Sequence, residues 1–267
     1  MQGFEAFWLG LTQGLTEFIP VSSSGHLEVV QEIMGGRSAD FHLFLEFINL
    51  GTFLALVIFY RKRIMQILRE IFVERNFKFA LNIVITCIPV VIAGILLSDF
   101  IEQSPFFSNM YTIAGAMAFI GILMILIDKL PKMKKVKDDH HLTWKQALYV
   151  GLAQCLALIP GTSRSGSTIV AGRMVGMDNK NAANYSFTVS MVVMAGVMVK
   201  SLISSSSREY IAANWQMLTL ANVVAFISGL AAIYFVMKFL EKKKSLQAFG
   251  WYRVVLATII IIFELLK

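Results

Sequence analysis

Charged and hydroxyl side chains interrupt two otherwise apolar stretches of this sequence, near residues 1–34 and 144–176. The first stretch carries Glu17 and a run of three serines and a glycine that ends at His26. The second carries Arg164 between two serines. An arginine can hold phosphate oxygens, a carboxylate and an imidazole can move protons, and a hydroxyl can act as a nucleophile. These residue types therefore point to chemistry on a phosphate or another anion.

A proline breaks each stretch and should end a helix there. The serines that follow Pro20 and Pro160 can cap a second short helix, over 23–34 and 164–175 respectively. The N-terminus of a helix presents unpaired N–H groups and the positive end of the helix dipole, and both favour an anion. If the two turns meet, two such termini converge on one site.

The charged residues in these stretches each allow more than one interpretation. A charge as deep as Arg164 is costly without a partner or a polar cavity. We favour anion binding for Arg164, and an ion pair with Glu17 is the alternative. Glu17 follows Gln13 by four residues on the same helix face, so it could hold a divalent cation or orient His26. For Ser22, Ser24 and Ser167, satisfying the broken backbone is as good an explanation as direct function.

The composition shows what kind of elements carry these residues. Of 267 residues, 57% are of the types AVILMFWYC and only 15% are charged, whereas a soluble domain has about 25% charged residues. We therefore expect an all-α integral membrane protein. Apolar windows of spanning length predict six transmembrane helices, over 41–60, 79–98, 106–127, 181–199, 211–237 and 245–266. The last window requires Arg253 to reach toward a membrane surface. The two interrupted stretches are predicted to be re-entrant helical hairpins, because lipid does not tolerate exposed broken backbone.

The basic residues predict the orientation of the chain. Connectors 61–78, 128–145 and 238–244 are rich in Lys and Arg, whereas 99–109 contains neither. The positive-inside rule places the basic connectors in the cytoplasm and 99–109 outside. The first hairpin then enters the membrane from the outside and the second from the inside. This distribution accounts for the net charge of +7, so we do not expect nucleic-acid binding.

The two hairpins also share sequence elements. Gly-Leu-x-Gln, Ile-Pro and Ser-x-Ser-Gly recur in the same order about 140 positions apart. Two units of opposite orientation make an inverted-topology repeat, which places a shared site between the halves. We expect one membrane domain over 1–267, with repeat 1 at about 1–127 and repeat 2 at about 144–267. A basic cytoplasmic connector, 128–143, joins them.

Three motifs resemble the signature of the undecaprenyl-diphosphate phosphatase family, also called bacitracin-resistance proteins. They are Gln13-x-x-x-Glu17, Pro20-Val-Ser-Ser-Ser-Gly-His26 and Pro160-Gly-Thr-Ser-Arg-Ser-Gly-Ser-Thr168. The resemblance covers essentially the whole chain. It implies an enzyme of the bacterial plasma membrane that converts undecaprenyl diphosphate to undecaprenyl phosphate, recycles the lipid carrier of cell-wall synthesis and confers bacitracin resistance. It also implies an extracytoplasmic active site, a homodimer and a divalent cation, Mg²⁺ or Ca²⁺.

By position, the resemblance assigns two sets of residues. The expected catalytic residues are Glu17, Ser23, His26 and Arg164. The expected substrate-binding residues are Gln13, Ser22, Gly25, Ser163, Ser165 and Thr168. Glu17 is also the expected metal ligand. Many members of the family have Glu where Gln13 stands, and an amide cannot supply a second carboxylate. Three nucleophiles fit the spacing: Ser23 activated by His26, His26 itself, or a water activated by His26.

Two other functions fit parts of this pattern. An inverted-repeat transporter or lipid flippase with a central anion site fits the repeat equally well, whereas the combination of Arg, Glu and His favours catalysis. A second family of membrane lipid phosphatases also carries a Ser-Gly-His element. That family needs a further His after its Ser-Arg pair, and no His follows Arg164 in this sequence. We therefore reject it.

Overall fold

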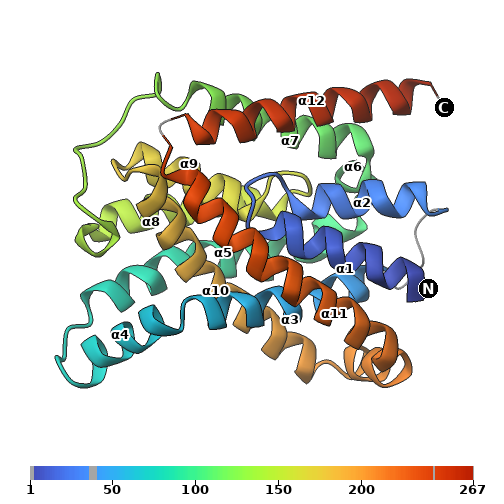
Figure 1. Cartoon of the computed structure of the whole chain (residues 1–267), viewed down its shortest axis with the longest axis horizontal. Coiled ribbons are helices and arrows are strands. Elements are labelled where there is room, and N and C mark those ends of the chain that lie inside the picture. The colour runs from blue at the N-terminus through green and yellow to red at the C-terminus, as the bar shows by residue number, and fades with distance from the viewer. Residues whose placement is uncertain (1–2, 36–40, 243, 267) are drawn as a thin grey trace.

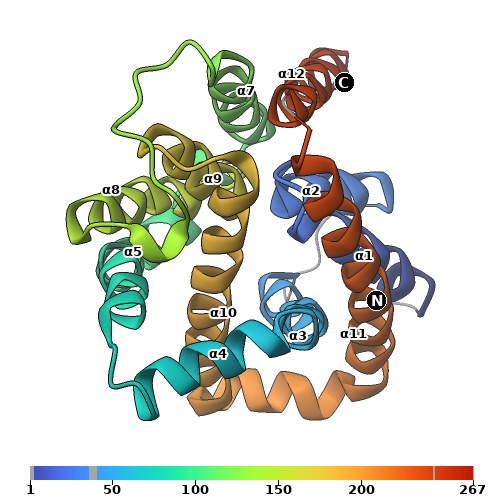
Figure 2. The ribbon, with the colours of Figure 1, turned by 60° about the vertical axis from the view of Figure 1, so that its left-hand side comes forward.

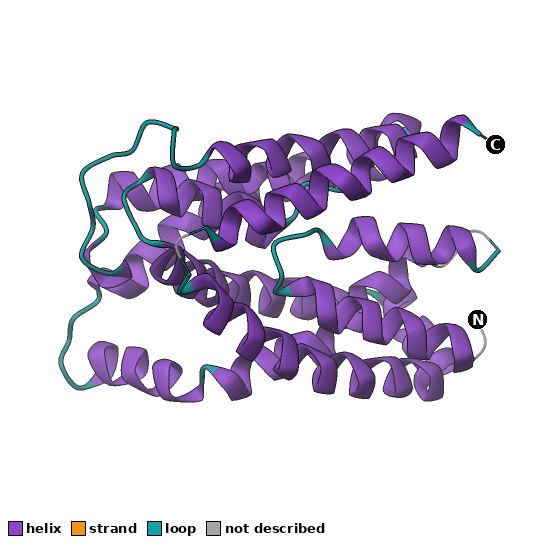
Figure 3. Cartoon of the chain, turned by 45° about the horizontal axis from the view of Figure 1, so that its top comes forward, coloured by secondary structure: helices purple, strands orange, loops and turns teal. Residues whose placement is uncertain are grey.

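The computed structural model describes residues 3–35, 41–242 and 244–266, and over these residues it contains helices and loops without strands (Figure 3). The longer helices are α1 (Gly3–Glu17), α2 (Ser23–Ile33), α3 (Phe41–Phe59), α4 (Arg61–Phe72), α5 (Lys78–Gln103), α7 (Met110–Leu126), α8 (Trp144–Gln154), α9 (Arg164–Met174), α10 (Asn179–Ile203), α11 (Ser205–Leu240) and α12 (Ser245–Leu265). The short ones are α6 (Pro105–Ser108), η1 (Asp139–His141) and η2 (Cys155–Leu158).

The fold is that of an integral membrane helical protein. Four helices of the described chain are long and apolar enough to cross a bilayer: α5 over Lys78–Leu97, α10, α11 and α12. A fifth candidate is the pair Leu43–Phe59 and Arg61–Phe72, which is bent by 69° at its break. These helices occupy five of the six windows expected from the sequence.

The expectation of one continuous helix over 106–127 is wrong. Asn109 has extended backbone (ψ 135°), and its side chain accepts a hydrogen bond from the Tyr111 N–H at 2.8 Å. This N-cap starts a new helix, α7, and separates it from α6. The apolar helix that results, Met110–Leu126, has 17 residues.

Each interrupted stretch forms two helices joined by a turn, a helical hairpin, and the second helix of each has the expected boundaries. Helices α2 and α9 cover the ranges 23–34 and 164–175 to within one residue at their C-terminal ends. In each hairpin the first helix packs closely on a long apolar helix, α1 on α11 and α8 on α5 (Figures 1 and 2). A Cβ at Gly10 would lie 2.5 Å from the Ala221 carbonyl oxygen, and one at Gly151 would lie 2.6 Å from that of Thr86. The recurring glycine thus lets the backbones touch.

The connectors divide between the two ends of the molecule. In Figure 1 the connector between α4 and α5, the connector between α7 and α8, and the end of α11 lie on the left. The two chain ends, α6 and the α10–α11 turn lie on the right. The basic connectors therefore share one end, as the charge pattern predicts.

Candidate active site

The site begins at the turns of the two hairpins, which have the same local geometry. Ser22 and Ser163 adopt positive φ values of 77° and 74°, which are rare for residues other than glycine. Each caps the helix that follows: the Ser22 hydroxyl accepts from the Gly25 N–H at 3.3 Å, and the Ser163 hydroxyl accepts from the Gly166 N–H at 3.1 Å. Strained backbone that recurs at equivalent places is typical of functional sites.

A buried arginine holds the two turns together. Arg253 of α12 is 0% exposed and donates to Pro20 O at 3.2 Å in the first turn. It also donates to Gly161 O and Thr162 O, both at 2.9 Å, in the second turn. The expectation that Arg253 reaches a membrane surface is therefore wrong. Broken helices leave carbonyl oxygens without partners, and the guanidinium satisfies several of them at once.

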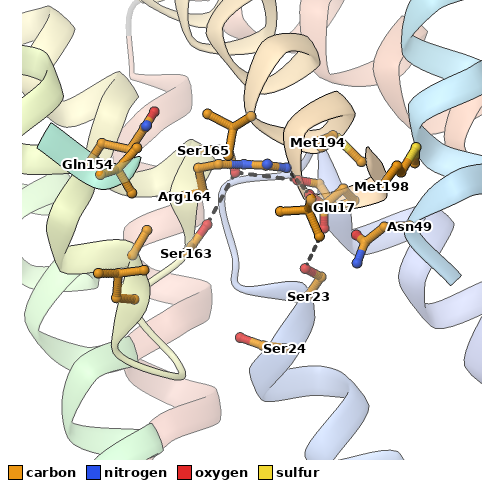
Figure 4. Close-up of a pocket in the computed structure, with 15 residues that line it drawn as sticks. Glu17, Ser23, Ser24, Asn49, Gln154, Ser163, Arg164, Ser165, Met194 and Met198 are labelled. Atoms are coloured by element: carbon orange, nitrogen blue, oxygen red, sulfur yellow. Dashed lines mark hydrogen bonds and ion pairs between the residues drawn. The ribbon is translucent and has the colours of Figure 1, made fainter. Parts of the chain in front are cut away.

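The turns form one wall of a cavity of about 250 Å³ (Figure 4). Its polar lining comes from both hairpins and α3: Glu17, Ser23, Ser24, Asn49, Gln154, Ser163, Arg164 and Ser165. Apolar side chains of α10, among them Met194 and Met198, close another side. The Gly161 N–H donates to Ser24 Oγ at 3.4 Å, so the tips of the hairpins meet as expected.

Glu17 lies at the centre of this lining. Its Oε2 accepts from Ser23 Oγ at 2.6 Å, and its Oε1 accepts from Arg164 Nη2 at 2.5 Å. Ser23 is the first residue of α2 and Arg164 the first of α9. One carboxylate therefore joins the N-termini of two helices from opposite hairpins. Figure 4 shows the Arg164 guanidinium extended toward Glu17, with Ser23 on the other side of the carboxylate.

The ion pair between Arg164 and Glu17 was the alternative interpretation of Arg164, and the structure contains it. The two side chains are 21% and 10% exposed, so water screens their attraction only partly. Their charges cancel within the cavity, while the N-termini of α2 and α9 still direct positive dipole ends at it. The cavity thus retains a preference for an anion even with the pair formed.

His26 lies outside the cavity lining. Its Nδ1 is 2.7 Å from Ser22 O, and its Nε2 is 2.7 Å from the Tyr252 hydroxyl. The two rings are stacked, with an interplanar angle of 2°. The expectation that Glu17 orients His26 is therefore wrong, because the turn carbonyl and the α12 tyrosine already hold both ring nitrogens.

The other expected site residues divide into two groups. Ser163 and Ser165 line the cavity, and Ser165 Oγ is 3.4 Å from Glu17 O. The structure does not bring Gln13, Ser22, Gly25 or Thr168 to the lining. Gln13 lies outside the lining but holds two lining residues in place, because its Nε2 donates to Glu17 Oε2 at 3.1 Å and to Asn49 Oδ1 at 2.8 Å. Thr168 is buried and 2.6 Å from Ser186 Oγ.

Asn49, Gln154 and Ser24 are polar lining residues outside the expected set, and the first two can be recognised in retrospect. Asn49 is a polar residue in the apolar span 41–60, a signal that was available. Gln154 recurs with Gln13 in the repeated motif, but it has no hydrogen-bond partner in the described structure. Leu158 stands where the first hairpin has Glu17, so the second hairpin gives its glutamine no carboxylate.

A divalent cation is compatible with these residues only in one arrangement. Among the described residues, no three His, Cys, Asp or Glu side chains gather at one place. Glu17 is the single carboxylate of the lining, with the oxygens of Ser23 and Asn49 beside it. Mg²⁺ accepts oxygen ligands and often uses one or two carboxylates together with phosphates of the substrate. The residues therefore fit a cation that is held jointly with a bound phosphate.

Comparison with known proteins shows the family to which the chain belongs. Residues 6–259 match the family model described as bacitracin resistance protein BacA. An undecaprenyl-diphosphatase of Clostridium tetani is 37% identical over 98% of this chain and 97% of its own length. One of Acinetobacter baumannii is 38% identical over 98% and 97%, and one of Myxococcus xanthus is 35% identical over 98% and 89%. The chain belongs to the BacA family of bacitracin resistance proteins.

Proposed function

We propose that this chain is an undecaprenyl-diphosphatase of the bacterial plasma membrane. It hydrolyses undecaprenyl diphosphate to undecaprenyl phosphate and inorganic phosphate, recycles the lipid carrier for cell-wall synthesis and confers bacitracin resistance. The observation that carries this proposal is Glu17, held between Ser23 and Arg164 in a cavity built by both hairpin turns. The names of the full-length relatives support it.

The diphosphate binds at the N-termini of α2 and α9. The planar guanidinium of Arg164 turns toward the phosphate oxygens, and the hydroxyls of Ser163 and Ser165 donate further hydrogen bonds to them. Phosphoryl transfer depends mostly on positioning and charge stabilisation, and a convergent set of backbone and guanidinium donors supplies both.

Among the three nucleophiles that fit the sequence, the contacts favour Ser23. Its hydroxyl already donates to Glu17, which can accept the proton as Ser23 Oγ attacks the terminal phosphorus. Undecaprenyl phosphate leaves, and water then releases phosphate from the serine. His26 acts through the turn, because it binds the Ser22 carbonyl and not Ser23.

A divalent cation, Mg²⁺ or Ca²⁺, is part of the proposal. Glu17, Ser23 and Asn49 would hold it, and it would neutralise charge on the diphosphate. The presence of Gln13 in place of a second carboxylate leaves the substrate to supply the remaining oxygens.

We also propose the finer topology: six membrane crossings, two re-entrant hairpins and an inverted repeat, with the site open to the extracytoplasmic side. The first helix of each repeat packs on a long helix of the other repeat, α1 on α11 and α8 on α5, and this packing supports the inverted repeat. The common end of the basic connectors supports the orientation. A homodimer is proposed from the family resemblance alone.

The direct test is phosphate release from undecaprenyl diphosphate by the purified protein in detergent, where no compartments exist. Steady release that stops on addition of EDTA and returns with Mg²⁺ or Ca²⁺ is the expected result. A transporter or flippase, the alternative, would release no phosphate in detergent. It would instead move a labelled prenyl phosphate between the leaflets of a liposome.

A further inference from the structure

We propose that the groove between α3, α10 and α11 binds the part of the prenyl chain nearest the diphosphate. This inference rests on the proposed function and adds where the apolar half of the substrate lies. The groove has a volume of about 650 Å³ and is lined on α3 by residues from Glu46 to Ile58. At 1.5 Å per residue this segment is about 18 Å long.

The groove continues directly from the candidate active site. Met198 of α10 lines both the site cavity and the groove. Along α10 the lining passes from Met194 in the cavity, through Met198, to Leu202 in the groove. On α3, Asn49 faces the cavity and the next residue, Leu50, faces the groove.

Its chemistry suits an isoprenoid chain. Leucine, isoleucine, valine, phenylalanine and tryptophan side chains dominate the lining. Glu46 is the one ionisable residue among the described lining residues, and it accepts a hydrogen bond from Ser201 Oγ at 2.7 Å. Met198, at the junction, has a flexible and polarisable side chain that adapts to branched ligands.

The covalent structure of the substrate selects this groove over other surfaces. The first isoprene unit is bonded to the phosphate, so the chain must leave the site cavity through a surface that adjoins it. Another pocket, near Arg173 and Glu241, is lined mostly by polar residues and shares no lining residue with the site. A groove of this length holds only the first units, and the remaining chain extends into lipid.

The test narrows the groove and compares substrates of different chain length. Leu54 and Val223 line the groove and are 44% and 50% exposed, so Leu54→Trp and Val223→Trp fill it from α3 and α11. Ile95→Trp is the matched control, because Ile95 is 75% exposed on α5 and does not line the groove. KM and kcat are measured for dimethylallyl, farnesyl and undecaprenyl diphosphates.

We expect both groove variants to raise KM for farnesyl and undecaprenyl diphosphate about tenfold, with kcat nearly unchanged. KM for dimethylallyl diphosphate should stay at the control value. Equal KM values in groove and control variants for every substrate would overturn the inference and leave the groove to membrane acyl chains. Wild-type protein that hydrolyses none of the three would instead contradict the proposed function.

If a tryptophan variant fails to fold, a farnesyl diphosphate analogue with a photoreactive terminal group gives an independent answer on the wild type. Crosslinks to groove residues of α3 and α11 support the inference. Crosslinks confined to α5 or α12 overturn it.

Discussion

Glu17 and Arg164 come from opposite hairpins and form an ion pair, with Oε1 and Nη2 2.5 Å apart. The pair is asymmetric with respect to the repeat, because the residues at the matching places are Leu158 and Ser23. Each hairpin thus contributes one charge of a single site. In the proposed mechanism, a diphosphate that binds Arg164 competes with Glu17 for the guanidinium and so frees the carboxylate to accept a proton from Ser23.

Arg164→Lys tests whether the planar shape of the Arg164 guanidinium matters beyond its positive charge. Lysine keeps the positive charge but presents it as a point, so it cannot bind two phosphate oxygens in parallel. We expect kcat/KM for undecaprenyl diphosphate to fall about 100-fold in Arg164→Lys and further in Arg164→Met. Activity of Arg164→Lys within a few-fold of wild type would show that the guanidinium makes no such contact.

Ser23 should carry a covalent phosphate during turnover. Rapid acid quenching with substrate labelled on the terminal phosphate should leave acid-stable label on the wild-type protein. Ser23→Ala should carry no label and lose at least about 1,000-fold in kcat. Label that survives an alkaline quench but is lost in acid would indicate His26 as the nucleophile, and the absence of label after both quenches would indicate water.

Arg253 should stabilise the fold as well as the site. Arg253→Met leaves buried carbonyls of both turns without donors, so we expect the free energy of unfolding in detergent to fall by at least about 2 kcal/mol. Arg208 is the matched control, because it also donates to two carbonyls, Leu202 O and Ile203 O, but is exposed. Arg208→Met should change stability by less than about 1 kcal/mol. Equal losses of stability in the two variants would contradict a role for Arg253 in holding the two turns together.

The two repeated glutamines should behave differently. Gln13→Met removes the donor to Glu17 and Asn49, so we expect it to lower kcat/KM about tenfold. Gln154→Met replaces a buried amide that has no hydrogen-bond partner among the described residues, so the melting temperature should stay or rise and activity should persist. A large loss of activity in Gln154→Met with intact folding would mean that Gln154 contacts the substrate.

The hairpins could be predicted because their signals are local. Proline, glycine and serine at Pro20, Pro160 and the capping serines determine where helices end and begin, and these boundaries were confirmed. The meeting of the two turns could be expected because the loop charges and the repeated sequence elements predict two hairpins of opposite orientation with a shared site between them. By contrast, the break at Asn109 depends on one cap within an apolar window, which hydropathy does not detect.

Among side-chain partners between distant elements, the sequence offers the Glu17–Arg164 pair as an alternative, but it does not indicate those of Arg253 and His26. Arg253 was expected to reach the membrane surface, because the sequence does not show that two turns leave carbonyls beside α12. Glu17 is one expected partner of His26 because both lie in the first hairpin, yet Tyr252, 226 positions away, binds the His26 ring. Spacing along a chain identifies neighbours within a helix, but it does not identify contacts made by folding.

The most direct test of the account is a double-mutant cycle of Glu17→Gln and Arg164→Met, with kcat/KM for undecaprenyl diphosphate as the readout. Residues that act as one unit show strongly non-additive losses. We predict that each variant loses at least about 100-fold and that the double variant is no worse than the poorer single one. Single losses that multiply in the double variant, or either single variant with nearly full activity, would contradict a site shared by the two hairpins.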